Sequence, residues 1–264
     1  MLLCSLLLGI GLSTTIGGTI PAGAEQRIIF SCSAQLYDIL HPQILKEFSI
    51  ATGIQITPYI TSSEAALYRL YNQVCDVAGT AEPIDFSHGE YGYTETPICT
   101  APIVVITHPA NSVDSVTQAQ LHAIFCGDIN SWQNLGGIDQ QIVTMVPDKN
   151  TAAYKNFSRL ALKRSDIYYN IMTKRSTMVV EVVRHIPGSI SFITKGSDTR
   201  DRAIKILKVD GVPHTAEAYP YYQSFSLVTR SKPSEGIKSF VDFICSQQTA
   251  ERLRSAGILP ASQQ

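Results

Sequence analysis

The pattern of apolar and polar positions along the chain alternates between strand-like and helix-like segments. Short β-branched runs at 27–31 and 54–60 indicate strands, and each precedes a longer stretch with apolar residues at helical spacing. Gly53 and Pro187-Gly188 end two of these helices. In all, the pattern predicts strands at 27–31, 54–60, 75–81, 101–109, 140–147, 189–194, 203–209 and 223–229, and helices at 36–51, 62–74, 117–125, 151–162, 178–188, 235–247 and 249–257.

This alternation predicts an α/β fold with parallel sheets that carry helices on both faces. The continuous apolar run at 101–109 is typical of a strand covered on both faces. Ligands of such folds bind beyond the carboxyl ends of the strands. No Gly-rich dinucleotide fingerprint follows any predicted strand, so the sequence argues against nucleotide binding.

Composition narrows the class of protein further. The chain has 264 residues, 44% of them hydrophobic, which is enough for one large domain or for two lobes. Its formal net charge of −1 argues against nucleic-acid binding, since phosphate backbones select for a basic surface.

The N-terminus resembles a secretory signal peptide. Residues 2–20 are apolar or small and uncharged, and Ala22-Gly23-Ala24 supplies an A-x-A cleavage site. We therefore expect a signal peptide at 1–24 and a periplasmic mature protein. No Lys or Arg precedes the apolar run, so a membrane anchor stays open as the alternative.

The mature chain would keep five cysteines, at positions 32, 75, 99, 126 and 245. In an oxidising compartment we expect one or two structural disulfides, with at least one thiol left over. The sequence contains no C-x-x-C, and no spacing of His and Cys suits zinc, so we expect no metal site.

A family resemblance rests on the stretch LHAIFCGDINSWQNLGG (121–137). It resembles the segment IF-x-G-x-I-x-x-W-x-x-L-G-G of phosphate-type solute-binding proteins of bacterial ABC transporters. Further similar segments follow in the same order along the chain, so that the resemblance covers nearly all of the mature protein. They are CDVAGTAEPI (75–84), IPGSISFI (186–193), YPYYQSFSLVT (219–229) and FVDFICSQQTAERLRSAGILP (240–260).

The resemblance implies the two-lobed type II fold of periplasmic binding proteins. Each lobe would be a mostly parallel sheet flanked by helices, with lobe 1 formed by 25–107 and 196–264 and lobe 2 by 108–195. Two crossings would form a hinge, and the lobes would close on a ligand in the cleft. The implied function is capture of a small oxyanion, most simply phosphate, by a monomer that holds no cofactor and delivers its ligand to an ABC transporter permease.

The resemblance also implies where the anion binds. Backbone N–H groups at helix N-termini and hydroxyl groups are common donors to such ligands. The first candidates are the Ser33 hydroxyl with the backbone N–H groups of Ala34 and Gln35, and the second are Ser62 and Ser63 at the next helix start. Plain helix capping explains these serines equally well.

Two further contacts follow from the resemblance. Asp76 could accept a hydrogen bond from hydrogen phosphate, which sulfate lacks at neutral pH. The loop before the helix at 151–162 contributes Asp148, Asn150 and Thr151. However, an arginine of the family falls on Pro147 in this chain, which leaves phosphate specificity open.

Two other functions compete with phosphate capture. One is a divergent binding, sensory or adhesion module with another ligand and no role in phosphate transport; the odd number of cysteines also favours it. The other is an enzyme, which the sequence argues against because it contains no G-x-S-x-G, H-E-x-x-H or Walker loop. Trp132 and the tyrosines at 219–222 could form a sugar platform, but packing explains them better.

Overall fold

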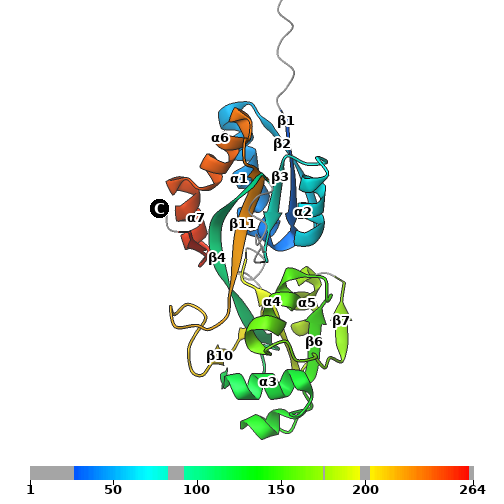
Figure 1. The fold of residues 1–264 in the computed structure, drawn as a ribbon. Coiled ribbons are helices and arrows are strands. Elements are labelled where there is room, and N and C mark those ends of the chain that lie inside the picture. Colours follow the sequence, from blue (N-terminus) through cyan, green and yellow to red (C-terminus); the bar gives the residue numbers. More distant parts are fainter. Residues whose placement is uncertain (1–26, 83–91, 175, 197–202, 262–264) are drawn as a thin grey trace, which may run out of the picture.

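The computed structural model describes residues 27–82, 92–174, 176–196 and 203–261. Figure 1 shows two halves, each with helices packed against strands, and two long strands that run between them. One sheet passes through both halves in the strand order β2-β1-β3-β11-β4-β8-β6-β7. The α/β class predicted from the alternation is confirmed.

The upper half in Figure 1 begins with three parallel strands joined by helices. β1 pairs with β2 on one side and β3 on the other, so Ser33 lies level with Thr61, and Cys32 with Gly79. The carboxyl ends of all three strands therefore lie at one edge. These elements are β1 (Arg27–Ser33), α1 (Ala34–Thr52), β2 (Gln55–Thr61), α2 (Ser63–Tyr71) and β3 (Val77–Thr80).

The C-terminal elements complete the upper half. α6 (Glu235–Ile244) and α7 (Gln247–Ser255) pack against α1, and β12 (Leu259–Pro260) pairs with the middle of β4. Phe240 of α6 contacts Phe30 and Phe48 edge to face, with ring centroids 5.4 and 5.2 Å apart. The first and last segments of the described chain therefore share one core.

Two strands connect the halves. The first part of β4 (Tyr93–Thr107) pairs with β11 (Tyr222–Arg230), and its second part, Ile103–Thr107, pairs with β8 in the lower half. β11 also pairs with β3, and all of these pairings are antiparallel. The sheet is therefore mixed at its centre, where the sequence predicted parallel strands, and parallel toward both ends.

The lower half repeats the strand-and-helix plan. β6 lies parallel to β7 and β8, and α4 follows β6 at its carboxyl end. The rings of Phe157 in α4 and Phe192 in β8 stack at 3.8 Å inside this half. The described elements of this half are β5 (Ser115–Val116), α3 (Gln118–Cys126), a short 3-10 helix (Trp132–Leu135), β6 (Val143–Pro147), α4 (Ala152–Ala161), β7 (Ile171–Thr173), α5 (Ser176–Val183), β8 (Ser189–Thr194), β9 (Lys205–Ile206) and β10 (Lys208–Val209).

The division between the halves differs from the boundary expected from the sequence. The expectation placed 196–264 in lobe 1. However, Leu207, Val209 and Tyr221 pack in the core of the lower half, together with Trp132. The chain thus returns to the upper half along β11, about where Tyr221 is followed by Tyr222.

Some strands differ from their predicted bounds. β4 begins at Tyr93, whereas the predicted strand began at 101. The sequence analysis missed its first residues because they include the polar Thr94 and Thr96 and lack the continuous apolar run that follows. The predicted strand at 203–209 divides into β9 and β10, which pair with different strands. The two- and three-residue strands β5, β7 and β12 gave no signal in the sequence.

No disulfide joins any two of the five described cysteines, so the expected disulfides are not formed in this structure. Cys32, Cys75 and Cys99 are buried, and Cys126 and Cys245 are half-buried. The predicted signal peptide at 1–24 lies outside the described ranges. Within those ranges, the structure contains no helix whose length and apolar character would let it cross a bilayer.

Candidate functional site

Three helices begin at the carboxyl ends of strands with a hydroxyl residue as N-cap. Ser33, Ser62 and Thr151 cap α1, α2 and α4, and each hydroxyl accepts a hydrogen bond from a backbone N–H three residues later, at 3.1–3.3 Å. The first N–H groups of a helix have no acceptor inside the helix, and the helix dipole adds partial positive charge there. Each of these helix starts is therefore suited to bind an anion.

Contacts between the halves bring these helix starts together. Nδ2 of Asn156, in the second turn of α4, donates to the carbonyl oxygen of Ala81 at 2.8 Å. Nζ of Lys155 lies 3.3 Å from Oε2 of Glu82 and 3.7 Å from Oε2 of Glu64. Because Ala81 and Glu82 follow β3 and Glu64 lies in the first turn of α2, the start of α4 faces the carboxyl edge of the upper sheet.

Thr80 is a residue at this edge that the sequence reasoning missed. It ends β3 and is fully buried, and its Oγ1 has no hydrogen-bond partner within the described part of the chain. Its neighbour Ala81 donates its backbone N–H to Oγ of Ser63 at 3.0 Å, which places Thr80 beside the first turn of α2. A buried hydroxyl without a partner is costly, so it points to a ligand that supplies one.

Gln223 presents a second buried polar group near the junction of the halves. Its Oε1 accepts a hydrogen bond from Oγ1 of Thr194, the last residue of β8, at 2.9 Å. Its Nε2 is buried and has no partner among the described residues. Gln223 lies in the segment 219–229 that takes part in the family resemblance, but this resemblance alone does not predict its burial.

The predicted residues of the α1 and α2 starts are found at this edge. Ser33 and Ser63 are buried, Gln35 is largely buried and Ala34 is exposed. The Ser63 hydroxyl is committed to Ala81, whereas Ser62 is a helix cap. The capping roles predicted from the sequence are therefore confirmed for Ser33 and Ser62.

The loop before α4 is a turn built on Asp148. Its Oδ1 accepts from the backbone N–H of Asn150 at 2.9 Å, and its carbonyl oxygen accepts from both the N–H and the hydroxyl of Thr151. Asp148 thus shapes the loop through local hydrogen bonds. The N–H groups of Ala152 and Ala153, which follow, donate to no residue in the described ranges.

Asp76 is not brought to this edge. It directly precedes β3, level with Ile29 of β1, and lies four residue steps along the strand from Thr80, a length of about 13 Å. Its Oδ2 accepts from the backbone N–H of Ile29 at 2.8 Å, and Oδ1 lies 3.6 Å from Nη2 of Arg230. The carboxylate therefore contacts β1 near its amino end and the carboxyl end of the antiparallel strand β11, at the end of the sheet away from the three helix starts.

Cys32, at the carboxyl end of β1, carries an unreactive thiol. Cys32 precedes the Ser33 cap, and burial, with a smaller contribution from the charge of Asp38, raises the pKa of its thiol to about 12. A thiol attacks as the thiolate, so Cys32 is not an activated nucleophile at neutral pH. The arrangement is one of hydrogen-bond donors suited to binding.

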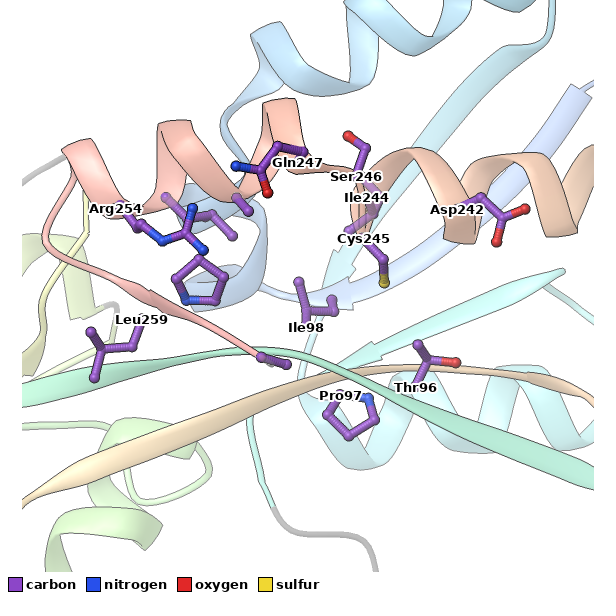
Figure 2. A pocket seen from close by; sticks show the side chains of 14 residues that line it. Thr96, Pro97, Ile98, Asp242, Ile244, Cys245, Ser246, Gln247, Arg254 and Leu259 are labelled. Carbon is purple, nitrogen blue, oxygen red and sulfur yellow. The ribbon is translucent and has the colours of Figure 1, made fainter. Parts of the chain in front are cut away.

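A cavity of about 1060 Å³ lies elsewhere, in the upper half between α6, α7 and strands β4 and β12. Figure 2 shows Cys245 pointing toward β4, with Asp242 and Arg254 at opposite ends of the cavity. Both charged side chains are exposed, and the starts of α1, α2 and α4 do not line the cavity. It therefore lacks the converging donors found at the junction of the halves.

Comparison with known proteins places the chain in a family. Residues 19–248 match the model of the PBP superfamily domain. The chain belongs to the PBP superfamily. The phosphate-binding protein PstS of Borreliella burgdorferi is 23% identical over 251 residues, which cover 89% of this chain and 90% of that protein.

Solved structures of similar fold agree with this membership. A phosphate ABC transporter substrate-binding protein from Clostridium perfringens, solved with bound phosphate, superposes with a TM-score of 0.81 and 22% identity, covering 90% of this chain and all of that one. An ABC-type phosphate transport receptor from Vibrio cholerae gives a TM-score of 0.72 with 19% identity, covering 88% and 99%. The type II periplasmic-binding-protein fold expected from the sequence is confirmed.

Proposed function

We propose that this protein is an extracytoplasmic solute-binding protein that captures phosphate between its two halves for import by an ABC transporter. The observation that carries the proposal is the meeting of three capped helix starts, two from the upper half and one from the lower, at the junction of the halves. A small oxyanion matches such converging N–H groups and dipoles. The PBP superfamily membership and the phosphate-binding relatives support the same function.

The contacts would come from both halves. From the upper half we propose the Ser33 hydroxyl, the backbone N–H groups of Ala34 and Gln35, and the α2 start at Ser62 and Ser63. We add the buried Thr80 hydroxyl, because it can donate a hydrogen bond to the ligand and has no partner among the described residues. From the lower half we propose Asn150, Thr151 and the N–H groups that follow, with Asp148 as the residue that shapes the loop.

The halves would act as lobes, with β4 and β11 as the hinge, because these two strands connect them near the site. Hinge bending about such paired strands opens and closes the cleft. In this proposal the protein binds and releases its ligand without covalent chemistry, is exported by the signal peptide at 1–24, and delivers phosphate to a permease as a monomer.

A specific observation favours a second candidate, a binding or sensory module for another ligand. Lys155, in the first turn of α4, is paired with Glu82, and Pro147 stands where the resemblance expects an arginine. A doubly charged anion is bound most strongly where a guanidinium fork is available. This candidate therefore predicts a less charged ligand.

Calorimetric titration of purified, ligand-stripped protein separates the two candidates. The panel is phosphate, sulfate, molybdate and tungstate at equal ionic strength. Saturation by phosphate at micromolar concentration supports the first candidate. Heat changes no larger than those of buffer dilution with all four anions would reject it in favour of the second.

A further inference from the structure

Two neighbouring residues of α4 bridge the halves beside the proposed ligand site. Lys155 of the lower half meets Glu82 of the upper half at 3.3 Å, with a second carboxylate, that of Glu64, at 3.7 Å. The side chains of Lys155 and Glu82 are 34% and 22% exposed, whereas that of Glu64 is 85% exposed. The Lys155–Glu82 pair is thus the better shielded of the two ion pairs.

Asn156 adds an uncharged bond at the same place. It is almost fully buried, and its Nδ2 is shared between the carbonyl oxygens of Ala81, in the opposite half, and Ala152, in its own helix. Its Oδ1 accepts from Nη2 of Arg159 at 2.9 Å, which fixes the orientation of the amide. The start of α4 is therefore held to the end of β3 by side chains of the protein itself.

We propose that Lys155 and Glu82 form an inter-lobe latch that sets how tightly the cleft retains its ligand. The proposal rests on the function proposed above for the cleft between the halves. Lys155 and Glu82 are positioning residues in it: they act by holding the two helix-start surfaces at binding distance.

The latch works through the balance between open and closed forms. A ligand that needs both halves binds only the closed form, so its apparent affinity scales with the fraction of protein that is closed. An ion pair formed only on closure raises that fraction before the ligand arrives. Because the pair is partly exposed, salt screens it, and its contribution is modest.

The test uses four single variants and one exchange. Lys155→Met and Glu82→Gln remove one partner each, and the double variant Lys155→Glu/Glu82→Lys restores the pair with the charges exchanged. Glu64→Gln is the matched carboxylate control, since that side chain is mostly exposed. Lys232→Met is the charge control, because Lys232 is exposed and follows β11 at the end of the sheet away from the cleft.

Two measurements are made on each protein. Small-angle scattering of the ligand-free protein reports the separation of the halves, and calorimetry reports the affinity for phosphate. We expect Lys155→Met and Glu82→Gln to increase the radius of gyration and to weaken phosphate binding by about threefold to tenfold. The exchange variant should recover most of both properties, and the two controls should match the wild type.

The scattering result decides the latch independently of the ligand. If the wild type does not bind phosphate, the proposed function fails, yet ligand-free Lys155→Met must still be more open than the wild type for the latch to hold. Equal scattering of Lys155→Met, Glu82→Gln and wild type would overturn the latch, even where phosphate binds. The latch would also be overturned if the exchange variant recovered neither the radius of gyration nor the phosphate affinity. That result would show that the single variants act through the loss of a particular side chain and not through the loss of the ion pair.

Discussion

Thr80 allows a prediction in which stability and affinity change in opposite directions. Its hydroxyl is fully buried at the end of β3 and has no partner in the described ranges. Thr80→Val keeps the shape of the side chain and removes the unsatisfied group. Because a buried unsatisfied polar group costs about 1–3 kcal/mol, we expect the ligand-free variant to be more stable than the wild type by an amount in that range.

The same substitution should weaken ligand binding. A hydrogen bond to a charged group contributes about 1.5–3 kcal/mol, which corresponds to a loss of about 10- to 150-fold in phosphate affinity. Urea unfolding of the ligand-free protein gives the first quantity, and calorimetric titration with phosphate gives the second. The two effects together identify a hydroxyl kept for the ligand at a cost to the fold.

Thr107→Val is the matched control. Thr107 is also fully buried in a strand, but its hydroxyl donates to the carbonyl oxygen of Ser189 and accepts from Nδ2 of Asn111. Removing that hydroxyl leaves partners unsatisfied and should lower stability by about 1–3 kcal/mol, with phosphate affinity unchanged. The reasoning about Thr80 is refuted if Thr80→Val behaves like Thr107→Val.

Three further predictions follow from the site and its surroundings. Thr151→Val should weaken phosphate binding by about tenfold, as measured by calorimetry, because it removes the hydroxyl that caps α4. Thr151→Ser keeps the hydroxyl and should bind phosphate like the wild type. Equal phosphate affinity of the two variants would move the site elsewhere. Asp76→Ala should lower the free energy of unfolding by about 1 kcal/mol, because it removes the hydrogen bond from the Ile29 backbone N–H and the partly exposed ion pair with Arg230. The variant should bind phosphate like the wild type, and a loss of phosphate affinity would return Asp76 to the site. Burial and the nearby Lys195 ammonium lower the pKa of His214 below its usual 6.5, so the unfolded chain binds a proton at this residue before the folded protein does, and the wild type should lose stability as the pH falls below that value. In thermal unfolding between pH 7.5 and 5.5, His214→Gln should therefore lose less stability than the wild type. An equal loss of stability in the two proteins would contradict the lowered pKa of His214.

Local signals in the sequence predicted the helix starts well. Hydroxyl residues before helical apolar spacing identified Ser33 and Ser62 as caps, because capping involves residues only three positions apart. The start of β4 was missed because Thr94 and Thr96 are stabilised by pairing with β11, more than a hundred residues later in the chain. Such pairing is not visible in the local pattern of apolar positions.

The site itself was less predictable than the fold. Asp76 was placed in it by resemblance, although its place as the second residue of the predicted strand 75–81 already indicated the amino end of the sheet, where ligands of such folds do not bind. Thr80 is the last residue but one of the predicted strand 75–81, but only the structure shows a buried hydroxyl without a partner among the described residues. The contacts of Lys155 with Glu82 join residues far apart in sequence, and no spacing rule predicts them.

The position of β11 has a consequence for the order in which the chain acquires its structure. β11 lies between β3 and β4, so the upper sheet stays interrupted until residues beyond 221 have been synthesised. The lower half is nested inside the upper one as a single uninterrupted stretch of sequence. A chain that emerges N-terminus first can therefore assemble its nested part while the outer part waits for its last strand, and contacts of such long sequence separation are the slow ones to form.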